Sequence, residues 1–185
     1  MGDGVRAREP AEPRADRPAM PAGYGILAPE AGSGLLPWSW VSEQMAAARN
    51  YWVVTVRRDG RPHAAPVWGI WLDETFYFST DPQSRKGRNF AANPHITVHL
   101  ESGDEAVILD GVVEPATDPV LLARFADAYD AKYHFRPDVN AGSPVYALRP
   151  RTVLGFLERD FVGSATRWRF PGENVNPVHD ERRTA

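Results

Sequence analysis

The sequence predicts a domain between the all-β and α+β classes, a β-barrel with short helical insertions. Two observations lead to this prediction. β-Branched and aromatic residues gather in short runs that suit strands, and turn-forming residues separate these runs. Few helical stretches lie between the runs, which favours antiparallel strands that pair with their neighbours along the chain.

The first half of the domain is expected to hold one helix and three strands. We place them at residues 39–49, 51–56, 63–72 and 75–80. Three consecutive alanines favour the helix, and Ser39 suits its N-cap. Asp59-Gly60 supplies the positive φ that a hairpin turn between the first two strands requires. Asp73-Glu74 then turns the chain into the third strand.

The second half adds two helices and five strands. We expect helices at 84–92 and from Asp118 onward, and strands at 96–101, 106–114, 145–148, 153–158 and 165–170. Asn93-Pro94 ends the first of these helices, because proline cannot continue one. Pro119 suits the first turn of the second helix. Its apolar face consists of Leu122, Phe125, Tyr129 and Tyr133.

The folded domain is predicted to span residues 35–170 of the 185-residue chain. Residues 1–34 are rich in Pro, Gly, Ala, Arg and Glu and hold almost no large apolar side chain. Such a segment buries too little surface to offset its ordering entropy, so we predict a disordered N-terminal arm. We expect its removal to leave thermal stability nearly unchanged. Residues 171–185 are polar and are predicted to form a C-terminal tail.

Composition excludes several classes of function. The chain has no cysteine, which excludes disulfides, thiolate metal sites and a cysteine nucleophile. A formal net charge of −3 argues against a role that depends on neutralising nucleic-acid phosphates. No apolar run approaches the roughly 20 residues of a membrane helix, and the N-terminus lacks a signal-peptide pattern. We therefore expect a cytoplasmic protein.

Two apparent motifs lack the structural context that their functions require. Residues 23–28 fit the dinucleotide pattern G-x-G-x-x-A, but prolines surround them where a strand and a helix would be required. His95 and His99 lie four residues apart in a predicted strand, which would separate them by about 13 Å, too far to share one metal ion.

An anion site is suggested by residues 75–89, where a strand ends in Ser79 and Thr80 and a helix then opens with Ser84-Arg85-Lys86. A helix N-terminus offers free N–H groups and a positive dipole end, and the two cations add charge at the same place. The residues alone leave a second interpretation open, in which this is a solvated basic helix start that pairs with neighbouring acidic residues.

From about residue 53 to 114 the sequence resembles the pyridoxamine 5′-phosphate oxidase-like superfamily. Its members are FMN-binding split β-barrels, and some bind a deazaflavin instead. The matching motifs are Asp59-Gly-Arg-Pro-His63, Pro66-Val-Trp68, Phe76-Tyr-Phe-Ser-Thr80, Ser84-Arg-Lys-Gly87 and Asn93-Pro94. Residues 166–170 look like the closing strand of this family. The resemblance implies a split β-barrel and a homodimer with cofactor sites at the subunit interface.

The same resemblance implies the cofactor-binding residues. Ser79, Thr80, Ser84, Arg85 and Lys86 would hold the cofactor phosphate and ribityl chain. Pro66, Val67 and Trp68 would lie along the ring system, although Trp68 is equally well explained as a core or interface aromatic. Arg167 and Trp168 would reach the ring or the substrate, in one version from the neighbouring chain.

Departures from the family pattern bear on the reaction. The Arg and Lys with which the oxidases grip FMN on the second strand correspond to Ala65 and Ile70, and a Gln aimed at the flavin falls near Ala106. The C-terminal R-x-H substrate signature is also missing. These departures argue against vitamin B6 oxidation. The sequence resembles instead the branch that uses the deazaflavin coenzyme F-420, especially in the segments Pro66-Val-Trp-Gly69, Ser84-Arg-Lys-Gly-Arg-Asn89 and His99-Leu-Glu-Ser-Gly-Asp104.

The expected function is that of a reductase that passes hydride from reduced F-420 to an electron-poor enone, quinone-like compound or tetrapyrrole. The residues leave the proton donor open between solvent, Tyr77 and His63. Two alternatives also remain: an FMN-dependent oxidoreductase, and a cofactor-binding protein without turnover.

Overall fold

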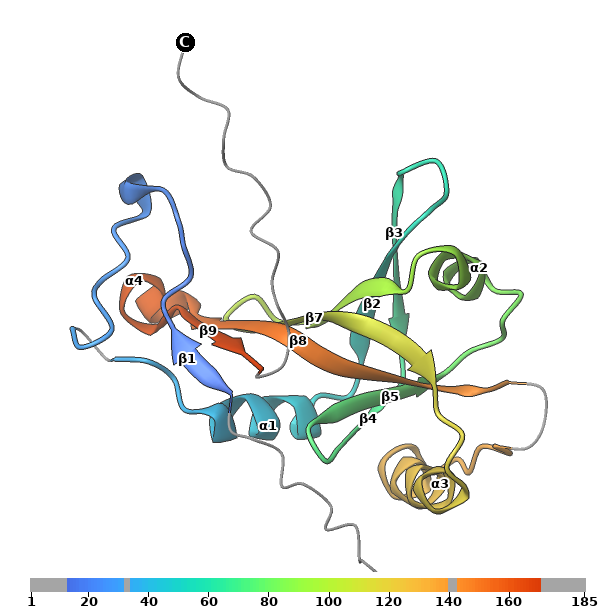
Figure 1. The fold of residues 1–185 in the computed structure, drawn as a ribbon. Coiled ribbons are helices and arrows are strands. Elements are labelled where there is room, and N and C mark those ends of the chain that lie inside the picture. The colour runs from blue at the N-terminus through green and yellow to red at the C-terminus, as the bar shows by residue number, and fades with distance from the viewer. Residues whose placement is uncertain (1–12, 32–33, 140–142, 171–185) are drawn as a thin grey trace, which may run out of the picture.

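The computed structural model describes residues 13–31, 34–139 and 143–170 of the chain. Nine antiparallel strands form its sheet (Figure 1). The strands are β1 (Arg14–Asp16), β2 (Tyr51–Val56), β3 (Pro62–Val67), β4 (Ile70–Leu72), β5 (Thr75–Ser79), β6 (His95–Leu100), β7 (Glu105–Pro115), β8 (Val145–Leu157) and β9 (Thr166–Arg169). The helices are α1 (Trp38–Ala47), α2 (Arg85–Ala92), α3 (Pro119–Tyr133) and α4 (Phe161–Ser164), with 3-10 turns η1 (Ala22–Tyr24) and η2 (Glu158–Asp160).

The sheet has the order β1-β9-β8-β7-β6-β2-β3, and β5 pairs with β8 and β4 beside this path. In the described chain β3 pairs only with β2, so the hydrogen-bonded ring between β3 and β5 stays open. The expected fold class, a split barrel with few helices, is confirmed. No helix within the described ranges is long and apolar enough to cross a membrane.

The barrel core lies on one face of this sheet. Trp168, Val153, Leu109, Val98 and Val53 are aligned across five strands by register, and all are buried. Helix α1 covers them and buries its own apolar residues in the same cluster. Each such side chain stabilises the fold by about 1.5–3 kcal/mol through removal from water, so this face fixes the register of the sheet.

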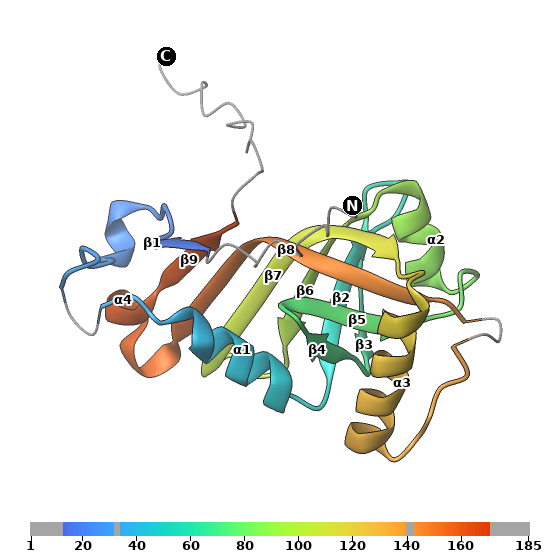
Figure 2. The same ribbon diagram turned by 60° about the horizontal axis from the view of Figure 1, so that its bottom comes forward.

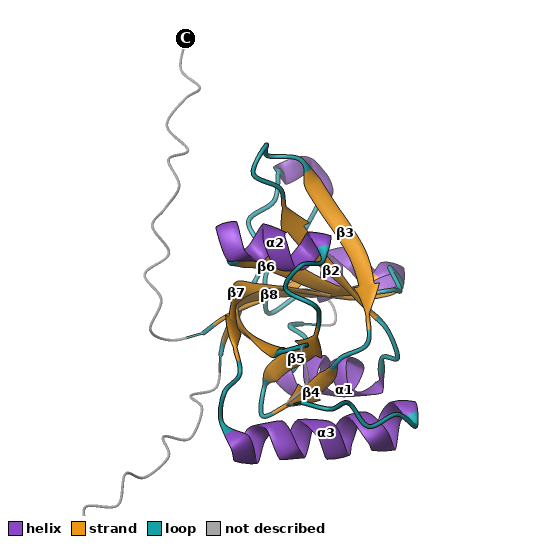
Figure 3. Ribbon diagram, turned by 90° about the vertical axis from the view of Figure 1, so that its right-hand side faces the viewer, coloured by secondary structure: helices purple, strands orange, loops and turns teal. Residues whose placement is uncertain are grey.

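A second core lies between α3 and the outer face of β4 and β5 (Figures 2 and 3). Phe125, Tyr129 and Tyr133 of α3 pack there against Ile70 and Tyr77. The predicted start of this helix is confirmed, because the carboxylate of Asp118 accepts from the Val120 N–H and Pro119 occupies the first turn.

Four predicted elements, one helix and three strands, require correction. Helix α1 begins at Trp38 with Pro37 at the N-cap position, rather than at Ser39. The single strand predicted at 63–72 is broken into β3 and β4 at Gly69, where a Cβ would lie 2.4 Å from the Phe76 ring. The two strands predicted at 145–148 and 153–158 form one continuous strand, β8. Pro150 is accommodated there at a register shift opposite β7.

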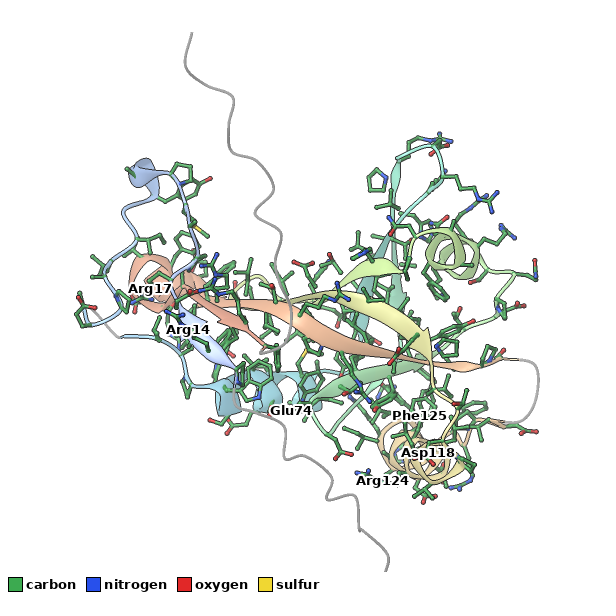
Figure 4. The ribbon with its side chains drawn as sticks, in the orientation of Figure 1. Arg14, Arg17, Glu74, Asp118, Arg124 and Phe125 are labelled. Atoms are coloured by element: carbon green, nitrogen blue, oxygen red, sulfur yellow. The ribbon has the colours of Figure 1, made fainter. Side chains whose placement is uncertain are left out.

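The predicted disorder of residues 1–34 is wrong for residues 13–31. Strand β1 pairs with β9 in the sheet, and the carboxylate of Asp16 forms ion pairs with Arg167 and Arg169. Arg17 donates to the carbonyl oxygens of Gly163 and Ala165 at 2.8 Å each (Figure 4). Polar contacts with the end of the domain therefore order a segment that has few apolar residues. Residues 1–12, 32–33 and the predicted tail 171–185 lie outside the described residues.

Candidate cofactor-binding site

The N-terminus of α2 is fixed by its own side chains. Ser84 is the N-cap, and its Oγ accepts from the Gly87 N–H at 3.1 Å. Thr80 Oγ1 lies 3.2 Å from the same hydroxyl. Gly87 also allows a close approach of the chain, because a Cβ there would lie 2.6 Å from the Pro82 carbonyl oxygen. The predicted turn between strand and helix is thus held by its own side chains, and Ser84 engages one of the first N–H groups of the helix.

Four cationic or titratable side chains converge beside this helix start. Arg85 and Lys86 come from α2, Arg57 follows β2, and His63 comes from β3. Burial lowers the pKa of His63, and the charges of Arg57, Lys86 and Arg85 lower it further. Burial also lowers the pKa of Lys86. Because cations of both the β2–β3 hairpin and α2 act on His63, the two elements share one electropositive region.

A groove of about 570 Å³ lies between the β2–β3 hairpin and α2. Arg57, Arg58, Arg85 and Arg88 line it together with Asn89, whose Nδ2 donates to Thr55 Oγ1 at 2.9 Å. None of these four arginines forms an ion pair within the described part of the chain. The Nε of Arg57 is buried without a hydrogen-bond partner. Asp59 also lines the groove but pairs with Arg61, and Arg88 donates to the Gln83 carbonyl oxygen. Arg57, Arg58 and Arg85 are therefore the forked donors that fit a phosphate group there.

Strand β3 extends from this groove toward α3 (Figure 1). It holds Pro66 and Val67 and ends next to Trp68, whose side chain is 40% exposed and stacks on Tyr133. The interpretation of Trp68 as a core residue is therefore wrong. Six residues of strand span roughly 17 Å, so an elongated ligand with its phosphate at α2 would place its other end near Trp68.

Ser79 and Thr80 are engaged by the chain itself. Ser79 Oγ donates to the Ser143 carbonyl oxygen at 2.9 Å and ties β5 to the start of β8. Thr80 is buried and bonded to Ser84. Both residues shape the turn before α2. The direct contacts available to an anion come from Arg85, Lys86 and the N–H groups of the helix start.

Arg167 and Trp168 lie on β9, at the opposite end of the sheet from α2 (Figure 1). Trp168 is 1% exposed and belongs to the barrel core, so its predicted contact with a cofactor or substrate is wrong. Arg167 points to the other face of the sheet, where its Nε donates to Asp16 Oδ1 at 2.8 Å. The alternation of side chains along a strand separates the two residues.

Three positions do not carry the side chains with which oxidases of the family contact FMN. Ala65 is half-buried opposite Val53, Ile70 is buried in the second core, and Ala106 is buried on β7. None of them offers a charge. Arg57 instead brings a guanidinium to the same hairpin, and sequence reasoning missed it, whereas His63 was considered only as a proton donor. The sequence did contain a signal for Arg57. It lies two residues after Thr55, near the Asp-Gly turn that pairs Thr55 with His63.

A second hollow of about 440 Å³ lies at the start of α3. Its main charges are already paired, because Arg124 binds Asp73 with two hydrogen bonds of 2.7 and 3.0 Å and Glu74 accepts from the Trp38 indole (Figure 4). Of its arginines only Arg149 lacks an ion pair in the described chain, whereas four arginines do so in the groove beside α2.

Comparison with known proteins identifies the family of the chain. The family model described as "Pyridoxamine 5'-phosphate oxidase" matches residues 41–156. The chain belongs to this family. A pyridoxine/pyridoxamine 5′-phosphate oxidase from Gluconobacter oxydans is 35% identical over 100 residues, which cover 50% of this chain and 48% of the relative. The chain thus matches about half the length of that curated relative.

Two solved structures extend the comparison. A structure titled "F420 Reductase" has 25% identity and a TM-score of 0.51, and the match covers 64% of this chain and 98% of that one. The General Stress Protein 26 of Bacillus anthracis has 22% identity and a TM-score of 0.54, with coverage of 64% and 92%. The latter similarity shows the fold alone. The family match and these structures together identify the chain as a split barrel of this family.

Proposed function

We propose that the protein is an oxidoreductase that transfers hydride from reduced coenzyme F-420 to an electron-poor organic substrate, such as an enone, a quinone-like compound or a tetrapyrrole. The observation that carries this proposal is that β3 contains no lysine or arginine, although the hairpin that it forms with β2 borders a groove rich in arginine. Ala65 and Ile70 stand where FMN-dependent oxidases of the family have cations.

The chain's own residues would bind and orient in this mechanism. Arg57, Arg85, Lys86 and the N-terminus of α2 hold the cofactor phosphate, and β3 lies along the ring system. When bound, the reduced cofactor supplies the hydride. The protein contributes by holding donor and acceptor in register, which lowers the entropic cost of the reaction. Tyr77 is buried in the second core, and burial together with neighbouring cations lowers the pKa of His63, so we propose solvent as the proton source.

An FMN-dependent reaction is the alternative that the family supports. The matching family model and the Gluconobacter relative both carry the name of an oxidase. FMN also presents a phosphate beside a ribityl chain, and the groove beside α2 would accept it equally well. The cofactor therefore has to be determined by binding.

We further propose that two copies of the chain form a homodimer through the face of the sheet opposite the core. We call this the open face. One row of it runs in register across β9, β8, β7, β6, β2 and β3 through Arg167, Leu154, Ile108, His99, Trp52 and Pro66. The helices place their buried residues in the two cores instead. A broad, half-exposed apolar sheet face supports association with a second copy.

The test is a fluorescence titration of the purified protein with F-420 and, in parallel, with FMN. We expect F-420 to bind more tightly. Arg57→Gln, Arg85→Ala and Lys86→Ala should each weaken binding by about 1–3 kcal/mol, the size of a charge-assisted hydrogen bond. Arg136→Gln, a surface variant outside the groove, is the matched control. Stronger binding of FMN would move the protein to the flavin-dependent alternative.

Turnover separates an enzyme from a binding protein. Reduced F-420 bound to the protein should be oxidised at a rate that saturates with an added quinone or enone. Tight binding without such oxidation across a broad panel of acceptors would contradict the proposed reaction and favour a protein that only binds the cofactor.

A further inference from the structure

An exposed aromatic ring and an exposed arginine lie together where β3 approaches α3. Trp68 stacks on Tyr133 with ring centroids 4.7 Å apart and planes 7° from parallel. The guanidinium carbon of Arg49 lies 5.8 Å from the centroid of each ring. We call Arg49, Trp68 and Tyr133 the Trp68 platform. Such an exposed indole beside a cation is the kind of surface that planar ligands bind.

The platform is held rigidly from below. The Tyr133 hydroxyl accepts from the Gly69 N–H at 3.0 Å and lies 2.7 Å from the Arg49 carbonyl oxygen. Tyr129, one turn earlier on α3, packs against both Trp68 and Tyr133. The backbone on either side of the platform is therefore fixed by one buried tyrosine, so a ligand would bind with little loss of side-chain entropy.

The platform carries positive charge without an ion-paired carboxylate. Glu101, Asp104 and Glu105 line a hollow together with Arg49, but none of them forms an ion pair with it. Neither Arg49 nor Lys132 forms an ion pair within the described ranges. Lys132 Nζ donates to the Tyr51 hydroxyl at 2.8 Å and to backbone oxygens. It therefore raises the positive electrostatic potential of the platform but offers no free donor to a ligand. Burial and then the charge of Arg49 lower the pKa of Lys132 to about 8, as expected for two cations without a counter-charge. The guanidinium of Arg49 remains available at the surface.

We infer that the Trp68 platform binds the acceptor substrate, and that this acceptor is a planar conjugated compound that carries a carboxylate. The ring system stacks on Trp68, and the carboxylate pairs with Arg49. The inference rests on the proposed function, since it places the acceptor at the end of β3 away from the phosphate groove. Among the proposed classes it favours carboxylated quinones and tetrapyrroles with acidic side chains over neutral enones.

The test compares two ligands that differ only in charge, anthraquinone-2-carboxylate and anthraquinone-2-carboxamide. Binding to the cofactor-loaded protein is followed by calorimetry and by tryptophan quenching. We expect the carboxylate to bind about tenfold more tightly, as one charge-assisted contact provides. Arg49→Gln should remove this preference and leave the affinity for the carboxamide unchanged. Trp68→Ala should weaken both ligands and remove most of the quenching.

Arg14→Gln makes the same change of charge on an exposed arginine of β1 (Figure 4) and should keep the preference. Equal binding of the two ligands by the unaltered protein, or a preference that survives Arg49→Gln, would overturn the inference. The cofactor titration is an independent readout. A protein that binds F-420 without a carboxylate preference retains the proposed function and loses the platform. A protein that binds no F-420 loses the proposed function and, with it, the assignment of the platform to the acceptor, even if the carboxylate preference is found without cofactor.

Discussion

Lys132 places an ammonium group between the rings of Tyr51 and Tyr133, 4.9 and 5.4 Å from their centroids. Tyr51 is fully buried, and its hydroxyl bonds to both Lys132 Nζ and the Met45 carbonyl oxygen. Burial lowers the pKa of Lys132 to about 8 and raises the pKa of Tyr51 well above its ordinary value. The two shifts have opposite effects on stability as the pH rises.

We therefore predict that the free energy of unfolding rises with pH from about 8 toward 10. In this range the unfolded chain keeps the proton on Lys132, whose ordinary pKa is 10.5, while the folded chain has lost it. Above pH 10 the sign reverses, because Tyr51 ionises in the unfolded chain and stays protonated in the folded one. Urea unfolding at several pH values measures both arms of this profile.

Lys132→Met should reduce the slope between pH 8 and 10, and Tyr51→Phe should reduce the fall above pH 10. Lys86, whose pKa burial also lowers, contributes a further share of the rising arm, so Lys86→Met is the matched comparison. Identical slopes in the unaltered protein and in Lys132→Met would show that this lysine is not responsible.

At the level of single residues, the sequence could predict the side chains of one continuous motif. Ser84, Arg85 and Lys86 follow each other, and a helix start places them together without help from the rest of the fold. Arg57 joins them only because β2 and β3 form a hairpin against which α2 packs. The error at Trp168 has a related cause, since resemblance located the strand but not which of its faces is buried.

Among the elements, the N-terminal arm shows what composition alone could not predict. A segment with few apolar residues is ordered because Asp16 and Arg17 bond to groups about 150 residues further along the chain. Burial raises the pKa of Asp16, but the hydrogen bonds and charges of Arg167 and Arg169 outweigh it and hold the pKa below its ordinary value. Long-range polar pairing of this kind leaves no local periodicity in the sequence.

Strand boundaries differ from prediction for equally specific reasons. The break between β3 and β4 depends on the close approach of Gly69 to the Phe76 ring, which is a contact between neighbouring strands. The continuity of β8 past Pro150 depends on the register shift in β7 opposite it. By contrast β2, α2 and α3 contain their own turn and cap signals and follow the prediction closely.

Removal of residues 1–17 should therefore destabilise the domain, contrary to what composition predicts. The deletion eliminates β1, the carboxylate between Arg167 and Arg169, and the donors of Arg17. At about 1 kcal/mol for each such bond, we expect the midpoint of thermal unfolding to fall by about 5–10 °C.

Removal of residues 1–12 keeps β1 and Arg17 and serves as the matched control in calorimetry. Glu30→Gln removes an acidic group of the arm that lies outside these ion pairs, and it should also leave the midpoint unchanged. Equal midpoints for both deletions would show that the pairing of β1 with β9 contributes little to stability.

For the whole molecule, the two faces of the sheet have different partners. One face is filled by α1 and the barrel core, and the open face carries Trp52 and His99 stacked 8° from parallel with their rings half-exposed. Pro66, at the end of the same row, is part of the strand proposed to lie along the cofactor. A second copy on this face would therefore cover the apolar row and lie beside the cofactor site at once.

This arrangement predicts that a variant that cannot dimerise also binds the cofactor weakly. Trp52→Glu introduces a charge into the middle of the open face without touching the groove beside α2. Light scattering after gel filtration should show a dimer for the unaltered protein and a monomer for the variant, with F-420 affinity lowered by more than about tenfold as the linkage of binding to assembly requires. Val120→Glu adds the same charge to an exposed apolar residue of α3 and should remain dimeric. A monomeric variant that binds the cofactor normally would place the complete site within one chain, whereas a Trp52→Glu protein that remains dimeric would place the interface on another surface.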